Sequence, residues 1–169
     1  MTGLSGSGKS TLAIALDQKL NNLSMRSYIL DGDNLRDGIC SDLDFSLKDR
    51  SENLRRAAEI SKLFVDAGII VIVGLISPLY KDRAFAKSLF ADDRFFEIYL
   101  STSLENCEKR DVKGLYKKVR DGEIKNFTGI DSPYDIPKNP NLIIDTSVYN
   151  VDDCVDMIVN KINYALKIK

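Results

Sequence analysis

A glycine-rich stretch near the start of the chain, GLSGSGKS, has the residue types and spacing of a phosphate-binding loop. It fits the pattern G-x-x-x-x-G-K-[ST], with Gly3 and Gly8 as its fixed glycines and Lys9 and Ser10 after them. Backbone N–H groups of such a loop and the helix N-terminus behind it form a concave site for phosphate oxygens. The lysine then reaches the β- and γ-phosphates, and the serine hydroxyl ligates Mg²⁺. The stretch predicts a nucleoside triphosphate site, with a flexible Gly/Ser turn as the alternative.

A second polar stretch, LDGDNLRDG, holds acids that phosphoryl transfer can use. Ligands of an open α/β sheet gather outside the carboxyl ends of its strands, so Asp31, Asp33 and Arg36 are expected to face the bound phosphates. A carboxylate there can orient an acceptor hydroxyl and help to position Mg²⁺, and the arginine can bind an anionic acceptor. The alternative for DGDN is an Asx-type turn that only shapes the chain. The most apolar segment, residues 69–76, ends without an acid.

Two basic regions follow. Residues 109–125 contain seven Lys or Arg residues and three acidic residues. Such a composition is typical of a solvated helical face. It also suits a lid that excludes water and surrounds the transferred group with positive charge. In DRSENLRR, helical spacing would place Arg50, Asn53 and Arg56 on one face suited to an anion. A solvated helix start with weak local ion pairs is the alternative there.

Composition excludes several classes of chemistry. There is no histidine, so a general base must be a carboxylate or, less readily, a lysine. The net charge of −1 gives no basic field for nucleic acid or an anionic membrane, and the longest apolar run is too short to cross a bilayer. The scattered Cys40, Cys107 and Cys154 indicate reduced thiols in a cytoplasmic protein.

The elements that must position these residues alternate between strand and helix. Apolar residues from Leu12 to Leu20 recur at helical spacing after the loop. The later segments predict, in order, a strand at 26–34, a helix from Ser51 to Gly68, a strand buried on both faces at 68–78, a short helix at 82–89, a strand at 95–101, a helix from about 104, a strand at 141–147 and a closing helix, Val151–Leu166, with a narrow apolar face. This order predicts one α/β domain, a P-loop NTPase-type parallel sheet with helices on both faces.

Taken in series, the motifs resemble those of the adenylylsulfate kinase (APS kinase) family. The matching segments run in order from Gly3 to Thr146 and are GLSGSGKST, LDGDNLRDG, DLDFS, DRSENLRR, ISP, KDR, RDVKGLYKKVR, GEIKNFTGIDSPYD and NPNLIIDT. Departures are Asp44, where relatives usually have glycine, and SPLY, which lacks a usual arginine after Pro78. The resemblance implies transfer of the γ-phosphoryl group of MgATP to the 3′-hydroxyl of adenylylsulfate, with ADP as the second product.

The resemblance also implies roles for individual residues. Asp33, Lys9 and Ser77 are assigned to catalysis, and Ser10 and Asp33 to Mg²⁺, partly through water. The residues assigned to ATP are Gly3, Ser5, Gly6, Ser7, Gly8, Lys9, Ser10, Thr11 and Arg110. Those assigned to adenylylsulfate are Asp33, Arg36, Phe45, Arg50, Asn53, Ile76, Ser77, Lys113 and Phe127.

Four further expectations rest on the resemblance. Residues 1–169 form a single kinase domain with a basic lid at about 109–129. A short apolar strand precedes Gly3 in the family, and only Met1 and Thr2 can represent its end, so native residues are expected upstream. A homodimer and functional coupling to ATP sulfurylase are expected. The alternatives are a kinase for another nucleotide or small metabolite, and a catalytically idle nucleotide-binding domain.

Overall fold

Short strands and helices alternate along residues 1–166, the part of the chain that the computed structural model describes. The elements are α1 (Lys9–Asn22), β1 (Ser27–Asp31), α2 (Gly32–Asp37), α3 (Leu47–Asp66), β2 (Ile70–Gly74), α4 (Tyr80–Ser88), β3 (Ile98–Leu100), α5 (Leu104–Arg110), α6 (Leu115–Arg120), β4 (Leu142–Ile144) and α7 (Val151–Leu166). None of the helices in this part combines the length and the apolarity needed to cross a bilayer.

The strands form two parallel pairs, β1 with β2 and β3 with β4. The first two residues of the chain lie between the pairs. Thr2 forms a parallel bridge with Tyr99 of β3, and the Met1 nitrogen donates to the Val73 oxygen of β2 at 2.7 Å. The strands therefore follow the order β1, β2, residues 1–2, β3, β4. Because they are parallel, their carboxyl ends and the loop after Thr2 lie at one end of the sheet.

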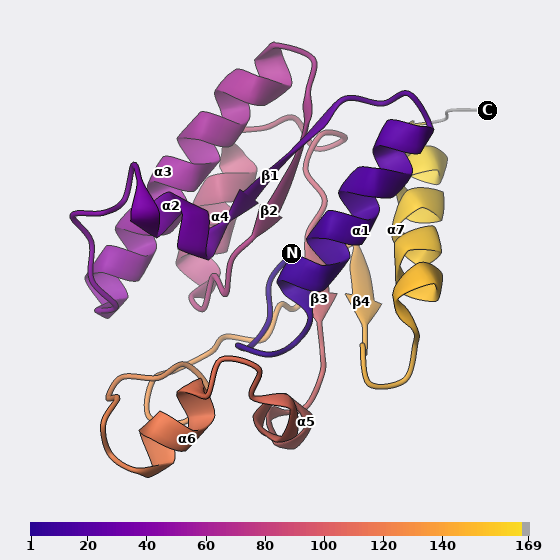
Figure 1. The fold of residues 1–169 in the computed structure, drawn as a ribbon. Helices are drawn as coiled ribbons and strands as arrows, with labels where there is room; N and C mark the ends of the chain where they lie inside the picture. Colours follow the sequence, from indigo (N-terminus) through magenta and orange to yellow (C-terminus); the bar gives the residue numbers. More distant parts are fainter. Residues whose placement is uncertain (167–169) are drawn as a thin grey trace.

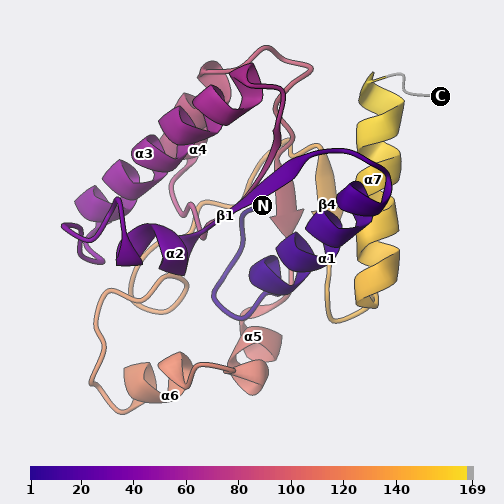
Figure 2. The same ribbon diagram turned by 45° about the horizontal axis from the view of Figure 1, so that its top comes forward.

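Helices cover both faces of this sheet, which confirms the predicted fold class. Figures 1 and 2 show α1 and α7 side by side on one face and α3 with α4 on the other. Each face has its own cluster of buried side chains, one built around α1, α7, β3 and β4 and the other around β1, α2 and α3. The sheet is thus a rigid base for the loops at its carboxyl end.

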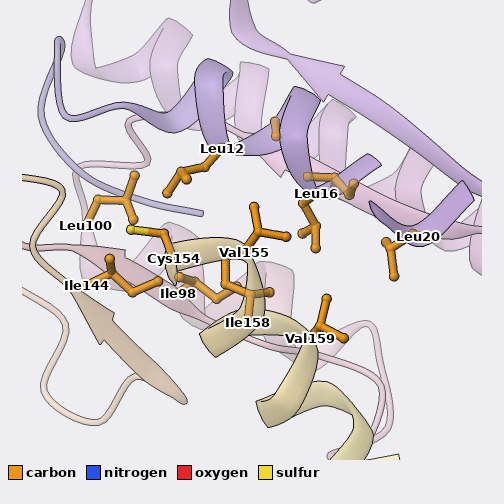
Figure 3. Close-up of a cluster of buried hydrophobic side chains, with 12 residues drawn as sticks. Leu12, Leu16, Leu20, Ile98, Leu100, Ile144, Cys154, Val155, Ile158 and Val159 are labelled. Carbon is orange, nitrogen blue, oxygen red and sulfur yellow. The ribbon is translucent and has the colours of Figure 1, made fainter. Parts of the chain in front are cut away.

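The larger cluster explains the predicted apolar pattern of the first and last helices. Leu12, Leu16 and Leu20 of α1 face Val155 and Ile158 of α7 over the ends of β3 and β4 (Figure 3). The narrow apolar face of α7 is therefore part of the core, although the side chain of Leu166 lies outside the described residues. Burial of these side chains, at about 25 cal/mol per Å² of apolar surface, is the main source of stability here.

Three element predictions were wrong in detail. Helix α3 starts at Leu47 rather than Ser51, because Ser46 caps it by accepting a hydrogen bond from the Asp49 nitrogen. The strand ends at Asp31, which caps a helix over Gly32–Asp37 where the sequence predicted a strand as far as residue 34. Strand β2 is buried only at Ile72 and Gly74 and half-buried elsewhere.

Candidate active site

A groove with a volume of about 860 Å³ lies at the carboxyl end of the sheet. It is lined by the glycine-rich loop, the start of α2, the chain after β2 and residues 110–127. It brings together every residue that the resemblance assigned to the site except Gly3 and Ser7. Segments far apart in the sequence thus meet at the place where ligands of an open parallel sheet bind.

The glycine-rich loop has the backbone of a phosphate cradle. Gly6 and Gly8 have φ angles of 74° and 93°, a left-handed region that glycine enters without steric cost. Gly8 is the residue before α1, so the amides of the first helical turn point into the groove. Gly3 and Ser7 do not line the groove because Ser7 is fully buried and a Cβ on Gly3 would lie 2.8 Å from the Ser7 hydroxyl oxygen. Gly3 and Ser7 therefore hold the conformation of the loop and do not face the groove.

Lys9 lies across the loop that it follows. Its ammonium donates to the backbone oxygens of Leu4 at 2.7 Å and Gly3 at 3.0 Å. Burial is the main cause that lowers the pKa of Lys9 to about 8, well below the value of a free lysine. A bound phosphate would give this ammonium a stronger partner than the two carbonyl oxygens.

Ser10, the residue predicted to ligate Mg²⁺, donates a hydrogen bond of 2.8 Å from its hydroxyl to Asp31 Oδ2. The other oxygen of Asp31 accepts from the Asp33 nitrogen at 3.0 Å and caps α2. A hydroxyl and a carboxylate side by side are oxygen ligands of the kind that Mg²⁺ prefers. Residues 1–166, which the structure describes, contain no group of three or more acidic, histidine or cysteine side chains suited to a metal.

Asp33 forms an ion pair with Lys113, which joins α2 to the basic segment across the groove. The side chains are 68% and 58% exposed, so this pair adds little to the stability of the fold. An anionic ligand entering the groove can therefore replace Asp33 as the partner of Lys113 at little cost. Asp33 is then free to contact the ligand.

The far end of the groove has one exposed aromatic ring between two cations. Phe45 is 59% exposed, and the guanidinium carbons of Arg36 and Arg50 lie 4.3 and 5.6 Å from its ring centroid. Burial and the neighbouring Arg36 lower the pKa of Arg50. The Asn53 amide nitrogen is buried without a hydrogen-bond partner, a donor that a ligand can satisfy. A flat aromatic group with an attached anion fits this end.

Arg56 does not take part in this end of the groove, contrary to the helical-face prediction. Its guanidinium binds Asp42 in a bidentate ion pair and also contacts Glu52. Both carboxylates are outside the groove lining, so Arg56 stabilises the chain between α2 and α3 instead.

The basic segment has exposed lysine and arginine side chains and is also anchored to the glycine-rich loop. Figure 1 shows α5 and α6 together beyond the ends of the strands. Tyr116 of α6 is buried, donates from its hydroxyl to the Ser5 oxygen at 2.9 Å and packs edge-on against Phe127 at 5.0 Å. Burial raises the pKa of Tyr116, so this hydroxyl remains a donor. Arg110 donates to the Gly6 oxygen and to Thr146.

The charge of the groove is opposite to that of the whole chain. Its lining includes six cations, Lys9, Arg36, Arg50, Arg110, Lys113 and Lys125, against three carboxylates, Asp31, Asp33 and Asp111. The net charge of the chain is −1. The groove is therefore a local positive site that favours anionic ligands.

Two contacts go beyond the residues that the resemblance assigned to the site. Asp31, which the sequence predicted to face the bound phosphates, accepts a hydrogen bond from Ser10. The Thr146 hydroxyl donates to the Ser7 oxygen at 3.0 Å and accepts from Arg110, which ties the end of β4 to the phosphate loop. No pattern in the sequence indicated that contact, because its partners are 36 and 139 residues away.

Gly6→Ala is expected to weaken nucleotide binding and to destabilise the protein. The new Cβ would lie 2.9 Å from the Cys107 oxygen, and the residue would keep a left-handed φ, so the loop must shift. Gly68→Ala has a similar φ but open space around its Cβ, and serves as the control for the backbone effect alone. ATP titration should show a loss of affinity in Gly6→Ala only, and thermal unfolding measures the loss of stability. Equal ATP affinity in both variants would contradict the cradle.

Comparisons with known proteins identify several relatives of this chain. A family model described as adenylylsulphate kinase matches residues 1–145. The curated adenylyl-sulfate kinase of Marinobacter nauticus is 55% identical over 158 residues, which are 94% of this chain and 79% of that protein. A solved APS kinase of Mycobacterium tuberculosis in complex with AMPPNP and APS has a TM-score of 0.92 and 48% identity, over 96% of this chain and 94% of that chain. A hexameric APS kinase from Thiobacillus denitrificans has a TM-score of 0.69 and 28% identity, over 96% of this chain and 28% of that chain.

Proposed function

This chain belongs to the adenylylsulphate kinase family, and from that premise we propose that its groove is where the γ-phosphoryl group of ATP is transferred to the 3′-hydroxyl of adenylylsulfate. The protein is a phosphotransferase, and its products are 3′-phosphoadenylylsulfate and ADP. The observation that carries the proposal is the meeting of Lys9, Asp33 and the Arg36–Phe45–Arg50 end in one groove. Donor and acceptor sites then face one shared space.

The donor half consists of the glycine-rich loop and its flanking residues. The loop amides and Lys9 bind the β- and γ-phosphates, and Arg110 lies over Gly6 where it can add positive charge. We propose that Ser10 holds Mg²⁺, with Asp31 as the adjacent carboxylate and Asp33 acting through water. When bound, the ion neutralises charge on the phosphates.

Asp33 is the residue that we assign to the acceptor hydroxyl. Its carboxylate orients the hydroxyl and accepts its proton while the oxygen bonds to the γ-phosphorus and the bond to the ADP oxygen breaks. With no histidine in the chain, a carboxylate is the available base. Lys113, released from Asp33, remains close enough to contact the transferred group or the acceptor. Ser77 and Ile76 line the groove beside this position.

The acceptor is bound by the other end of the groove and covered by the lid. Arg36 and Arg50 suit the phosphosulfate anion, and Phe45 and Phe127 suit the adenine ring. The unpaired Asn53 amide supplies a further donor. The lid, residues 109–129, excludes water from the transferred group, which favours transfer over hydrolysis.

Several coarser features complete the proposal. Residues 1–169 act as a single kinase domain, working as a homodimer in the cytoplasm and coupled functionally to ATP sulfurylase. Buried free thiols at Cys40, Cys107 and Cys154 suit a reducing compartment. The hexameric relative supports assembly of some kind for this family.

A panel of acceptors tests the assignment of substrate. With MgATP as donor, kcat/KM for adenylylsulfate should exceed that for AMP, CMP and shikimate by about 100-fold or more, because a site built for hydrogen-bonded, charged groups rejects ligands without them. A better rate with another acceptor would identify a different small-molecule kinase. ATP binding without any acceptor-dependent ADP release would identify an idle nucleotide-binding domain.

A further inference from the structure

The chain immediately after β2, residues 76–78, forms a turn with a disfavoured backbone at the edge of the groove. Ser77 has a φ of 47°, in the left-handed region that a residue with a Cβ seldom occupies. Ile76, Ser77 and Pro78 all line the groove. A conformation of this kind persists only where the surrounding structure holds it.

Hydrogen bonds from behind the turn hold all three of its carbonyl oxygens. The Thr2 hydroxyl donates to the Ile76 oxygen at 2.7 Å. Arg83 Nη1 donates to the Ser77 oxygen at 2.7 Å and to the Pro78 oxygen at 3.2 Å. The Asp135 nitrogen also donates to the Pro78 oxygen, at 2.8 Å. The turn therefore has little freedom to relax.

Arg83 is the centre of this network. It comes from α4, and its guanidinium is buried, with the residue only 6% exposed. Besides the turn, its Nε donates to Glu97 Oε1 at 2.8 Å and its Nη2 to the Asp135 oxygen at 2.6 Å. A buried cation is unfavourable unless it is paired and hydrogen-bonded, and here each of the three nitrogens has an oxygen partner.

The partners of Arg83 join two parts of the site. Residues 76–78 line the groove, whereas Asp135 lies six residues after residue 129, where the lid ends. The Asp135 carboxylate also accepts from the Tyr80 nitrogen at 2.8 Å, which fixes the segment to the start of α4. The Arg83 guanidinium thus connects two segments, the chain that follows the lid and the turn at residues 76–78.

We propose that Arg83 is a positioning residue for the acceptor in the reaction assigned above. It holds Ser77 in its left-handed conformation and fastens the returning lid segment to the turn, so that the acceptor is seated at a fixed place relative to Asp33. This inference rests on the proposed function and goes beyond the residues predicted from the sequence. Arg83 itself does not line the groove, so it acts through residues 76–78.

A merely structural role makes a different prediction. If the Arg83–Glu97 pair served stability alone, its loss would lower the unfolding midpoint without separating the two substrates. A positioning role changes the KM for adenylylsulfate much more than the affinity for MgATP, because the glycine-rich loop does not contact Arg83.

The test uses Arg83→Lys, which keeps the positive charge but cannot form the fork of hydrogen bonds. We expect the KM for adenylylsulfate to rise about tenfold or more, which corresponds to the loss of one good hydrogen-bonded contact, while the Kd for ATP stays within about twofold. Thr2→Val removes the hydroxyl bonds to the Ile76 and Ser77 oxygens and the one shared with the Tyr134 hydroxyl. It should shift the same KM in the same direction and guards against misfolding of the first variant. Lys87→Met, an exposed change on α4, is the matched control and should leave both constants unchanged.

The outcomes separate this inference from the proposed function. If the wild type uses adenylylsulfate but both test variants keep its KM, or if both substrates weaken together, Arg83 is structural and the inference is wrong. If the wild type and Lys87→Met show no turnover of adenylylsulfate at all, the proposed function fails and this inference fails with it.

Discussion

Asp33→Asn is expected to lower the rate of 3′-phosphorylation at saturating substrates by about 100-fold or more, because a positioned general base typically contributes at least this factor. The amide keeps the shape of the side chain but cannot accept the hydroxyl proton. Since Asp33 is exposed and its pair with Lys113 contributes little stability, the unfolding midpoint should change by no more than a degree or two, the effect of about 0.5 kcal/mol or less.

The matched control is Asp37→Asn, at the end of the same short helix and outside the groove lining. Affinity for ATP in the absence of Mg²⁺ should be near the wild-type value in both variants, because Asp33 does not contact the glycine-rich loop. If Asp33→Asn turned over adenylylsulfate at the wild-type rate, the assignment of Asp33 to the acceptor hydroxyl would be wrong. If Asp37→Asn were equally impaired, the effect would come from α2 as a whole.

Lys9→Met should cause a loss of kcat of about 100- to 1,000-fold, the range observed when one donor to a developing negative charge is removed. Methionine preserves the length of the stem and removes the ammonium that lies in the loop. ATP affinity should fall as well, since the phosphates lose a charged partner. Steady-state kinetics and ATP titration measure the two effects separately.

Lys19→Met on the same helix is the control for Lys9→Met. Lys19 forms an exposed ion pair with Asp156 at 2.9 Å, far along α1 from the groove, so its loss should leave turnover unchanged. A Lys9→Met protein with kcat within threefold of the wild type would show that the loop amides alone stabilise the transferred group.

Local patterns were sufficient to predict the parts of the site that are continuous in the chain. The glycine-rich loop and the helix after it follow directly from eight residues, because each glycine and the lysine act within that segment. The alternation of strands and helices predicted the parallel sheet, and the parallel sheet in turn predicted that Asp33 and Arg36 would face the loop. These two residues do line the groove with Lys9.

Contacts between distant segments could not be predicted in this way. Ser10 meets Asp31 across 21 residues and Arg83 meets Asp135 across 52, and neither pairing has a periodic signal. Arg56 was placed with the anion site by its helical spacing alone, whereas Asp42 offers it a bidentate carboxylate. Spacing on a helix defines a face but not the partner of that face.

The start of α3 was misplaced for a different reason. Ser46 and Ser51 are both plausible helix starts, but only Ser46 has an acid three residues later, and its hydroxyl donates to Asp49 Oδ2 at 2.7 Å. Ser51 instead lies inside the helix and donates to Asp82 at 2.6 Å. A capping pair was therefore available in the sequence and outweighs a serine on its own.

Coupled measurement of ADP release, with and without adenylylsulfate, tests the central claim most directly. With MgATP alone we expect slow release, because transfer rather than hydrolysis is the function of a lidded groove. Addition of adenylylsulfate should raise the rate by about 100-fold or more, with one 3′-phosphorylated product formed for each ADP, as positioning of the acceptor for transfer requires. Equal rates of ADP release in the presence and absence of adenylylsulfate, with no phosphorylated product, would contradict the account.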